Sequence, residues 1–178
     1  MRVIETANVA VLIQSFIETL LSIGTTQACW WRRPLFAEMD VSLRVRPAEP
    51  SEPGYDSNPN KNALRTWEGA ISGDINGQIL FSLTNFIVEG PNNEWGHFWE
   101  ISQIHDENGV LLMETYNEGY THQTKGYYGI VGKVTYTSPE FARWQGHTVF
   151  MHGKISPRPA KWQTSSEIPI APGKFYVF

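Results

Sequence analysis

The chain has 178 residues, of which 41% are hydrophobic and 13% aromatic, and this fits one domain with a sizeable core. The net charge is −4, and no basic patch is present. This argues against a nucleic-acid partner, because phosphates are bound mainly by Lys and Arg. The single cysteine, Cys29, excludes an intramolecular disulfide framework and a thiolate metal cluster.

Residues 1–28 admit two interpretations. An apolar stretch at residues 9–23 precedes a small residue at Ala28, as in a secretory signal peptide cleaved after Ala28. The same apolar residues recur at spacings of three and four, as in an amphipathic helix. The stretch contains Glu18 and is too short for a stable membrane span. A cleaved leader implies a secreted or periplasmic protein, and a packed helix implies a cytoplasmic one.

From residue 37 onward the chain repeats short apolar–polar alternations separated by turn residues. Successive side chains of a strand point to opposite faces, so each alternation predicts a strand with one buried face. The pattern continues after a Pro-rich loop at 47–63, and residues 35–178 are therefore expected to form one domain with a Pro-rich C-terminal tail. The expected strands are 37–46, 66–75, 78–89, 96–105, 110–120, 127–137 and 147–155, with a helical turn capped by Ser138 and an edge strand at 174–178.

Seven or eight antiparallel strands remove their exposed edges when they close into a barrel. We therefore predict an all-β fold, a closed antiparallel barrel of about eight strands preceded by the N-terminal helix or leader. A barrel of eight strands has an interior wide enough for one small ligand. Its aromatic residues either fill this interior or line a ligand cavity. Gly69, Gly73, Gly129 and Gly132 lie inside strands, where glycine permits sharp coiling or close packing.

The run from Trp67 to Gly77 (WEGAISGDING) resembles the opening hairpin of the allene oxide cyclase-like barrels, which include plant cyclases and small bacterial barrel proteins. The glycines of residues 125–137 and the run Trp144-Gln145-Gly146-His147 are similar as well, so the resemblance covers about residues 65–155. It implies a closed barrel, association into a homo-oligomer such as a trimer or dimer, and cyclisation of an unstable fatty-acid epoxide in an apolar lumen. No catalytic motif of the family aligns with this chain residue by residue.

Strand parity selects the candidate site residues, because an ionisable group that faces an apolar lumen is either paired or functional. If Val110 and Leu112 face inward, Glu114 and Tyr116 do so too. A buried Glu beside a Tyr hydroxyl suits proton transfer or the steering of developing charge. Alternatively, Glu114 faces water or bonds a neighbouring strand. The catalytic candidates are Glu114, Tyr116 and Glu100, and the ligand-binding candidates are Asn85, Phe81, Trp67, Phe98 and Tyr128.

The five histidines show no metal-ligand spacing, and the chain has no phosphate loop, nucleophile elbow or dinucleotide fingerprint. We therefore predict neither a metal site nor a cofactor. Three functions fit these patterns. The favoured one is a barrel that binds a small apolar or amphipathic molecule in an aromatic-lined lumen. The alternatives are a cyclase or isomerase acting on a hydrophobic substrate in that lumen, and a structural or assembly protein that uses a filled barrel as a scaffold.

Overall fold

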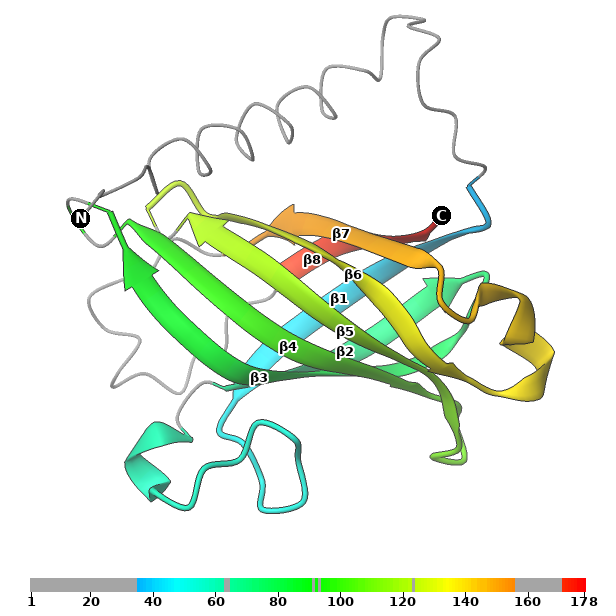
Figure 1. Ribbon diagram of the computed structural model, residues 1–178, viewed down its shortest axis with the longest axis horizontal. Helices are drawn as coiled ribbons and strands as arrows, with labels where there is room; N and C mark the ends of the chain where they lie inside the picture. The colour runs from blue at the N-terminus through cyan, green and yellow to red at the C-terminus, as the bar shows by residue number, and fades with distance from the viewer. Residues whose placement is uncertain (1–34, 63–64, 91, 93, 123, 156–170) are drawn as a thin grey trace, which may run out of the picture. The chain divides into compact units, whose positions relative to one another are not determined.

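The computed structural model describes residues 35–62, 65–90, 92, 94–122, 124–155 and 171–178, and their eight strands close into one antiparallel barrel (Figure 1). The closed eight-stranded barrel predicted from the sequence is thereby confirmed. The N-terminal helix or leader, residues 1–28, lies outside the described residues. The strands are β1 (Ala37–Arg46), β2 (Thr66–Gly73), β3 (Gly77–Glu89), β4 (Trp95–His105), β5 (Leu111–His122), β6 (Tyr127–Thr137), β7 (Thr148–Lys154) and β8 (Ala171–Val177).

Each strand pairs with its neighbours in the sequence, and β8 returns to pair with β1. The expectation of a C-terminal edge strand was wrong in this respect. Strand β8 pairs with β7 on one side and with β1 on the other, so its two edges are both hydrogen-bonded. Closure satisfies these backbone groups, which an edge strand would leave to solvent.

Alternation along the strands separates the barrel interior from the outer surface. On β1, every second residue from Ala37 to Val45 is buried, and the intervening residues are exposed up to Arg44. The buried residues of β1 from Ala37 to Leu43 join one hydrophobic cluster that includes Ile71, Phe81 and Phe175. Burial of this apolar area is the main stabilising term of the fold.

The short 3₁₀ helix η3 (Pro139–Trp144) connects β6 to β7 at one end of the barrel (Figure 1). Trp144 is buried in the hydrophobic cluster. The ring of Phe141 stacks on the Trp144 ring, and the two ring centroids are 4.9 Å apart. Ser138 precedes this helix as predicted, but its side chain makes no capping hydrogen bond. Its carbonyl oxygen accepts the N–H of Phe141 instead. The predicted position of this turn is therefore correct, and its predicted capping contact is wrong.

The opposite end is more open along β3. Pairing between β2 and β3 ends at Thr66 and Ser82, whereas β3 continues to Glu89 beside β4 alone. Phe86 and Val88 pair with the inward residues of β4 but are 37% and 42% exposed. Apolar side chains therefore lie at the rim of the barrel on this side.

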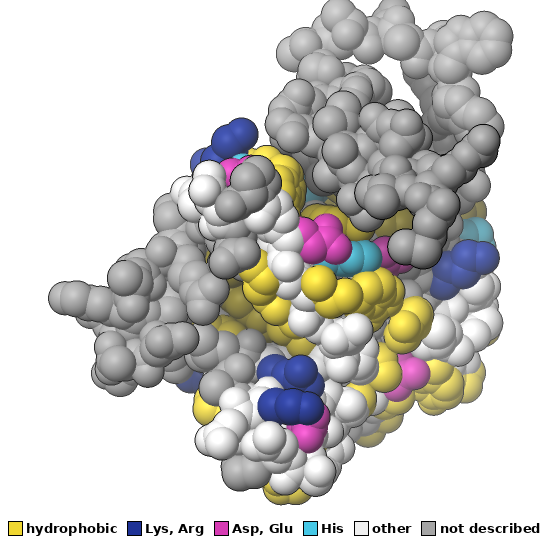
Figure 2. Space-filling model, turned by 60° about the vertical axis from the view of Figure 1, so that its left-hand side comes forward, with side chains coloured by type: hydrophobic (Ala, Val, Ile, Leu, Met, Phe, Trp, Pro, Cys, Tyr) yellow, Lys and Arg dark blue, Asp and Glu magenta, His cyan; other side chains and the backbone are white. Residues whose placement is uncertain are grey.

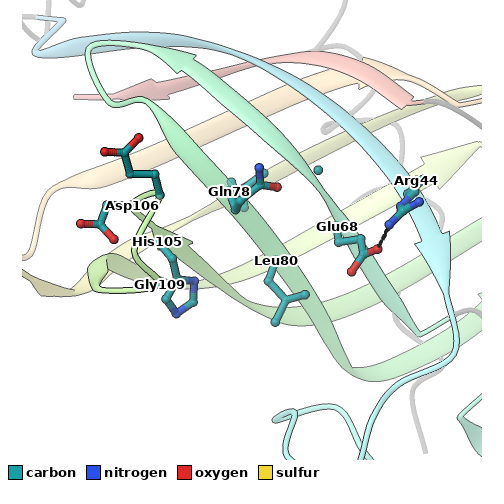
Figure 3. Close-up of a pocket in the computed structure, with 10 residues that line it drawn as sticks. Arg44, Glu68, Gln78, Leu80, His105, Asp106 and Gly109 are labelled. Carbon is teal, nitrogen blue, oxygen red and sulfur yellow. Dashed lines mark hydrogen bonds and ion pairs between the residues drawn. The ribbon is translucent and has the colours of Figure 1, made fainter.

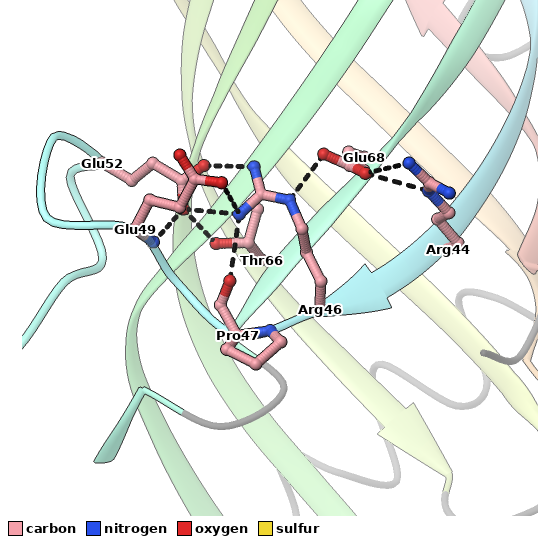
Figure 4. Close-up of polar contacts among 7 residues, drawn as sticks. All are labelled: Arg44, Arg46, Pro47, Glu49, Glu52, Thr66 and Glu68. Carbon is pink, nitrogen blue, oxygen red and sulfur yellow. Dashed lines mark hydrogen bonds and ion pairs between the residues drawn. The ribbon is translucent and has the colours of Figure 1, made fainter. Parts of the chain in front are cut away.

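The Pro-rich loop after β1 is tied to the barrel by an ion-pair network around Arg46 (Figure 4). The Arg46 guanidinium bonds Glu52 of the loop and Glu68 of β2, which lies 2.5 Å from its Nε. Glu52 also accepts a hydrogen bond of 2.7 Å from Thr66. Arg44 completes the network from the exposed side through Glu68. Further along the loop is the short 3₁₀ helix η2 (Pro59–Lys61).

We expect Arg46→Ala to loosen this loop far more than Arg44→Ala. The Arg46 side chain is 21% exposed and joins two strands to the loop, whereas Arg44 is 61% exposed and, among the described residues, bonds only Glu68. Loss of Arg46 should destabilise the fold by about 1–2 kcal/mol, and loss of Arg44 by about 0.5 kcal/mol. Urea unfolding measures both values, and limited proteolysis with mass mapping measures cleavage within residues 47–62. Equal cleavage rates in the two variants would contradict the proposed tether.

Within the part of the chain that the structure describes, no helix has the length and apolar character needed to cross a membrane.

Candidate functional site

Four polar side chains form a cluster inside the barrel, and we call it the polar quartet: Glu100 and Ser102 of β4, and Thr115 and Asn117 of β5. Glu100 is the direct cross-strand partner of Asn117, and Ser102 is that of Thr115. The strand period of two puts each pair of residues on the same face. All four are at most 2% exposed.

Hydrogen bonds connect the quartet through Asn117. Its amide nitrogen lies 2.8 Å from Oε1 of Glu100, 2.9 Å from Oγ of Ser102 and 2.7 Å from Oγ1 of Thr115. Ser102 also donates to Oε1 of Glu100 over 3.0 Å. An amide NH₂ has only two protons, so it cannot serve all three acceptors at once. At any moment, one of these three acceptors therefore receives no proton from the Asn117 amide.

Among the residues that the structure describes, no cation pairs with Glu100. Every Lys and Arg of the eight strands occupies an outward position, namely Arg44, Arg46, Lys133, Lys154 and Lys174. Burial raises the pKa of Glu100 from 4.5 to about 8, although hydrogen bonds from Asn117 and Ser102 act in the opposite direction. At neutral pH the side chain is consequently a protonated acid that can donate a hydrogen bond.

Four buried side-chain atoms lack hydrogen-bond partners among the described residues, and two of them, Ser82 Oγ and Trp144 Nε1, lie off the inward faces of the strands. The two on the inward faces are Oδ1 of Asn117 and the hydroxyl of Tyr128 on β6. The Tyr128 hydroxyl lies beside Gly153 and Gly173, because a Cβ at either glycine would overlap it. Burial, and next the charge of Glu100, raises the pKa of the Tyr128 phenol. Glu100 and Tyr128 therefore interact electrostatically within the same barrel interior.

Glu114 and Tyr116 do not belong to this cluster, and the inward orientation on which their selection as catalytic candidates depended was wrong. Tyr116 is 51% exposed. Glu114 accepts a hydrogen bond from Gln103 over 2.9 Å, so the alternative of a bond to a neighbouring strand is correct. The inward row of β5 instead contains Met113, Thr115, Asn117 and Gly119. This orientation of β5 places both Glu114 and Glu118 on the outer face of the barrel, so that neither carboxylate lies in the interior.

Asn85 also differs from its predicted position. A β-bulge between Leu83 and Asn85 shifts the register of β3 against β4. A bulge adds one residue to one strand and so exchanges the two faces beyond it. The inward row continues at Phe86, and Asn85 is exposed and accepts the N–H of Phe86 through its own Oδ1.

The other four ligand-binding candidates do lie on the inward face. Phe81 and Phe98 are 3% and 8% exposed and belong to the hydrophobic cluster. Trp67 and Tyr128 are partly buried and pack against this cluster. The barrel interior therefore combines the polar side chain of Glu100 with the apolar surfaces of these aromatic residues.

Sequence reasoning missed Asn117 and Thr115 as site residues. The signal was available in the charge pattern of β5, because one face carries two glutamates and the other carries none. Burying two unpaired carboxylates is more unfavourable than burying an amide and a hydroxyl that bond each other. Parity combined with this rule would have selected the face of Asn117.

The outer surface carries a second candidate, a groove of about 610 Å³ over β1–β4 and the following turn (Figure 3). Arg44, Glu68, Gln78 and His105 line it, and the Arg44–Glu68 ion pair crosses one side. On another view of the surface, apolar side chains lie between small groups of charged and His side chains (Figure 2). Among the described residues, no group of three His, Cys, Asp or Glu could hold a metal ion.

The chain matches no protein-family model, no curated protein and no solved structure. The resemblance to the allene oxide cyclase-like barrels therefore stays a prediction, and the site must be interpreted from its own geometry.

Proposed function

We propose that the barrel binds a small apolar or amphipathic molecule in its lumen, with the polar end of that molecule against the polar quartet. The observation that carries this proposal is the pair of unpartnered atoms, Asn117 Oδ1 and the Tyr128 hydroxyl. Leaving a buried polar atom unbonded costs about 1–3 kcal/mol, and native proteins keep few such atoms. A molecule with its polar end at the quartet would satisfy Asn117 Oδ1, and a second polar group further along it would satisfy the Tyr128 hydroxyl.

The rim of the barrel supports the same proposal. Phe86 and Val88 lie on the inward face of β3 and remain partly exposed. They provide an apolar approach to the interior at the end opposite Trp144, which is buried. Apolar walls with a few convergent polar groups are typical of small-molecule sites.

Native mass spectrometry of the full-length protein, purified from its source, tests the proposal. We expect an excess mass that leaves on denaturation and can be extracted and classified. Ser102→Leu fills space beside Glu100 and should lower the bound mass, while the outward Gln103→Leu should leave it unchanged. Circular dichroism checks that both variants fold. A protein mass without any excess in the natural protein would overturn ligand binding and favour the filled scaffold. The same spectrum gives the oligomeric state.

Glu100 favours a second candidate function, a cyclase or isomerase. An acid that is buried and protonated at neutral pH can give a proton to a substrate and take one back. Isomerisation conserves mass, so the extracted molecule should return from incubation with fresh protein at the same mass and a changed chromatographic retention. Glu100→Gln should abolish the change. An unchanged retention time would leave binding as the function.

A further inference from the structure

We infer that the open edge of β3, residues 84–89, is a homodimer interface, at which this edge pairs antiparallel with the same edge of a second copy of the chain. The inference does not depend on the proposed function, because it concerns the backbone and side chains at the end of one strand. It follows from the point at which the pairing of β3 with β2 stops and from the residues that lie beyond that point.

The edge of β3 that faces away from β4 has no strand partner beyond Leu83 among the described residues. Pairing with β2 ends at Ser82, and the N–H of Leu83 still donates to the carbonyl oxygen of Arg65. Residues 85–89 remain paired with β4 on their other edge (Figure 1). Alternate N–H and C=O groups of this stretch therefore point to the open side, where another strand can bond them.

The side chains of this open edge do not protect it against pairing. Proteins commonly protect such an edge with Lys, Pro or a charge, and residues 84–88 contain none of these. They include instead Ile87 and Val88, which are 43% and 42% exposed. The N–H of Phe86 donates to Oδ1 of Asn85, a side-chain acceptor, which indicates that this N–H lies on the open edge. By alternation, the N–H of Val88 lies on the same edge.

A second copy fits this edge because the edge is complementary to itself. When Ile87 faces the partner's Ile87 across a two-fold axis, Phe86 faces the partner's Val88 and Asn85 faces the partner's Glu89. Apolar side chains then meet apolar ones, and each carboxylate meets an amide instead of another carboxylate. The backbone groups of Phe86 and Val88 lie on the open edge, so these two residues can exchange hydrogen bonds in this register.

The neighbouring registers fit less well. A shift of the partner toward the start of β3 would set the partner's Glu89 against Leu83. The loop already covers that position, because a Cβ at Gly54 would overlap the Leu83 carbonyl oxygen. A shift the other way would set Phe86 against Gly90, which has no side chain to pack against the ring. The loop and the glycine therefore leave Ile87 at the two-fold axis.

Sedimentation velocity of the full-length protein over a concentration series measures the dimer. We expect Ile87→Lys to raise the dissociation constant roughly tenfold or more, because two like charges would face each other across the axis. Ile87→Glu should do the same by itself. Mixing the two variants should restore the dimer, since opposite charges then face each other. Val131→Lys is the matched control, because Val131 is 48% exposed on β6 and lies on no open edge.

Val88→Pro tests the backbone pairing separately. Proline has no N–H, and the N–H of Val88 lies on the open edge, so the barrel keeps its own hydrogen bonds while each copy loses one at the interface. This variant should also raise the dissociation constant roughly tenfold or more. Circular dichroism checks that each variant folds.

Three results would overturn the inference. The first is a natural protein that stays monomeric at every concentration. The second is a dimer that Ile87→Lys and Val88→Pro leave unchanged, because its interface would then lie elsewhere. The third is a mixture of the two charge variants that stays monomeric, because residue 87 would then not face its own copy across the axis.

Discussion

We expect the natural protein to lose stability as the pH rises, and replacing Glu100 with Gln should abolish this loss. The folded state raises the pKa of Glu100 from 4.5 to about 8. Between these values the folded protein holds a proton that the unfolded chain has released. The stabilising contribution is therefore complete below about pH 4.5 and is lost as the pH rises through about 8. The loss is on the order of 5 kcal/mol, since the two pKa values differ by about 3.5 and each pKa unit corresponds to about 1.4 kcal/mol.

Urea unfolding at one-unit steps from pH 5 to pH 9 measures this effect. The difference between the natural protein and Glu100→Gln isolates the one group, because all other titrating residues are shared. Above pH 8 we expect the variant to be the more stable of the two. Glu114→Gln is the matched control, since Glu114 lies on the outer surface of β5 and its loss should leave the pH dependence in place. Parallel pH curves for the natural protein and Glu100→Gln would show that Glu100 titrates normally.

The second large effect is expected from Gly132→Ala. Gly132 pairs with Asn117, and a Cβ at this position would overlap both Asn117 Oδ1 and the carbonyl oxygen of Tyr116. The first overlap is with the polar quartet, and the second is with backbone that can move only if β5 and β6 separate. Overpacking of this kind destabilises by about 1–3 kcal/mol, and the backbone overlap puts this variant at the upper end or beyond.

Val131→Ala provides the control, because Val131 is adjacent on β6 but points outward and is 48% exposed. Its substitution should change the free energy of unfolding by no more than about 0.5 kcal/mol. The double variant Asn117→Ser with Gly132→Ala should be less destabilised than the two single changes added together, since one overlap disappears. Simple additivity would mean that Asn117 does not share the space at Gly132.

The candidate site could be predicted in part from the sequence. Alternation placed Glu100 and Phe98 on one face of β4, and the structure puts this face inside the barrel. It placed Phe81 and Trp67 correctly as well, because both lie in regular strands before any bulge. Alternation gives two faces for each strand but does not say which of them is the interior. On β5, where apolar residues occur on both faces, that choice was made wrongly.

The errors at Asn85 and Tyr116 have different causes. At Asn85, one inserted residue between paired strands exchanged the faces, and a bulge of this kind has no reliable mark in a single sequence. At Tyr116 the pattern itself was ambiguous, and only the requirement that Glu114 and Glu118 stay solvated decides it. The first error needs the register of the neighbouring strand, whereas the second needs a rule about burying charge.

By itself the sequence determined that there are seven or eight strands, their approximate bounds and the antiparallel meander, because these follow from alternation and turn residues within short segments. The tertiary structure decided what depends on partners far apart in the chain. Closure of β8 onto β1 gives the terminal strand a second neighbour. The pairing of β4 with β5 brings Glu100 beside Asn117, and the packing of Tyr128 against Gly153 and Gly173 places a phenol in the same interior. Local periodicity cannot encode these contacts, since each depends on which strands become neighbours and in which register.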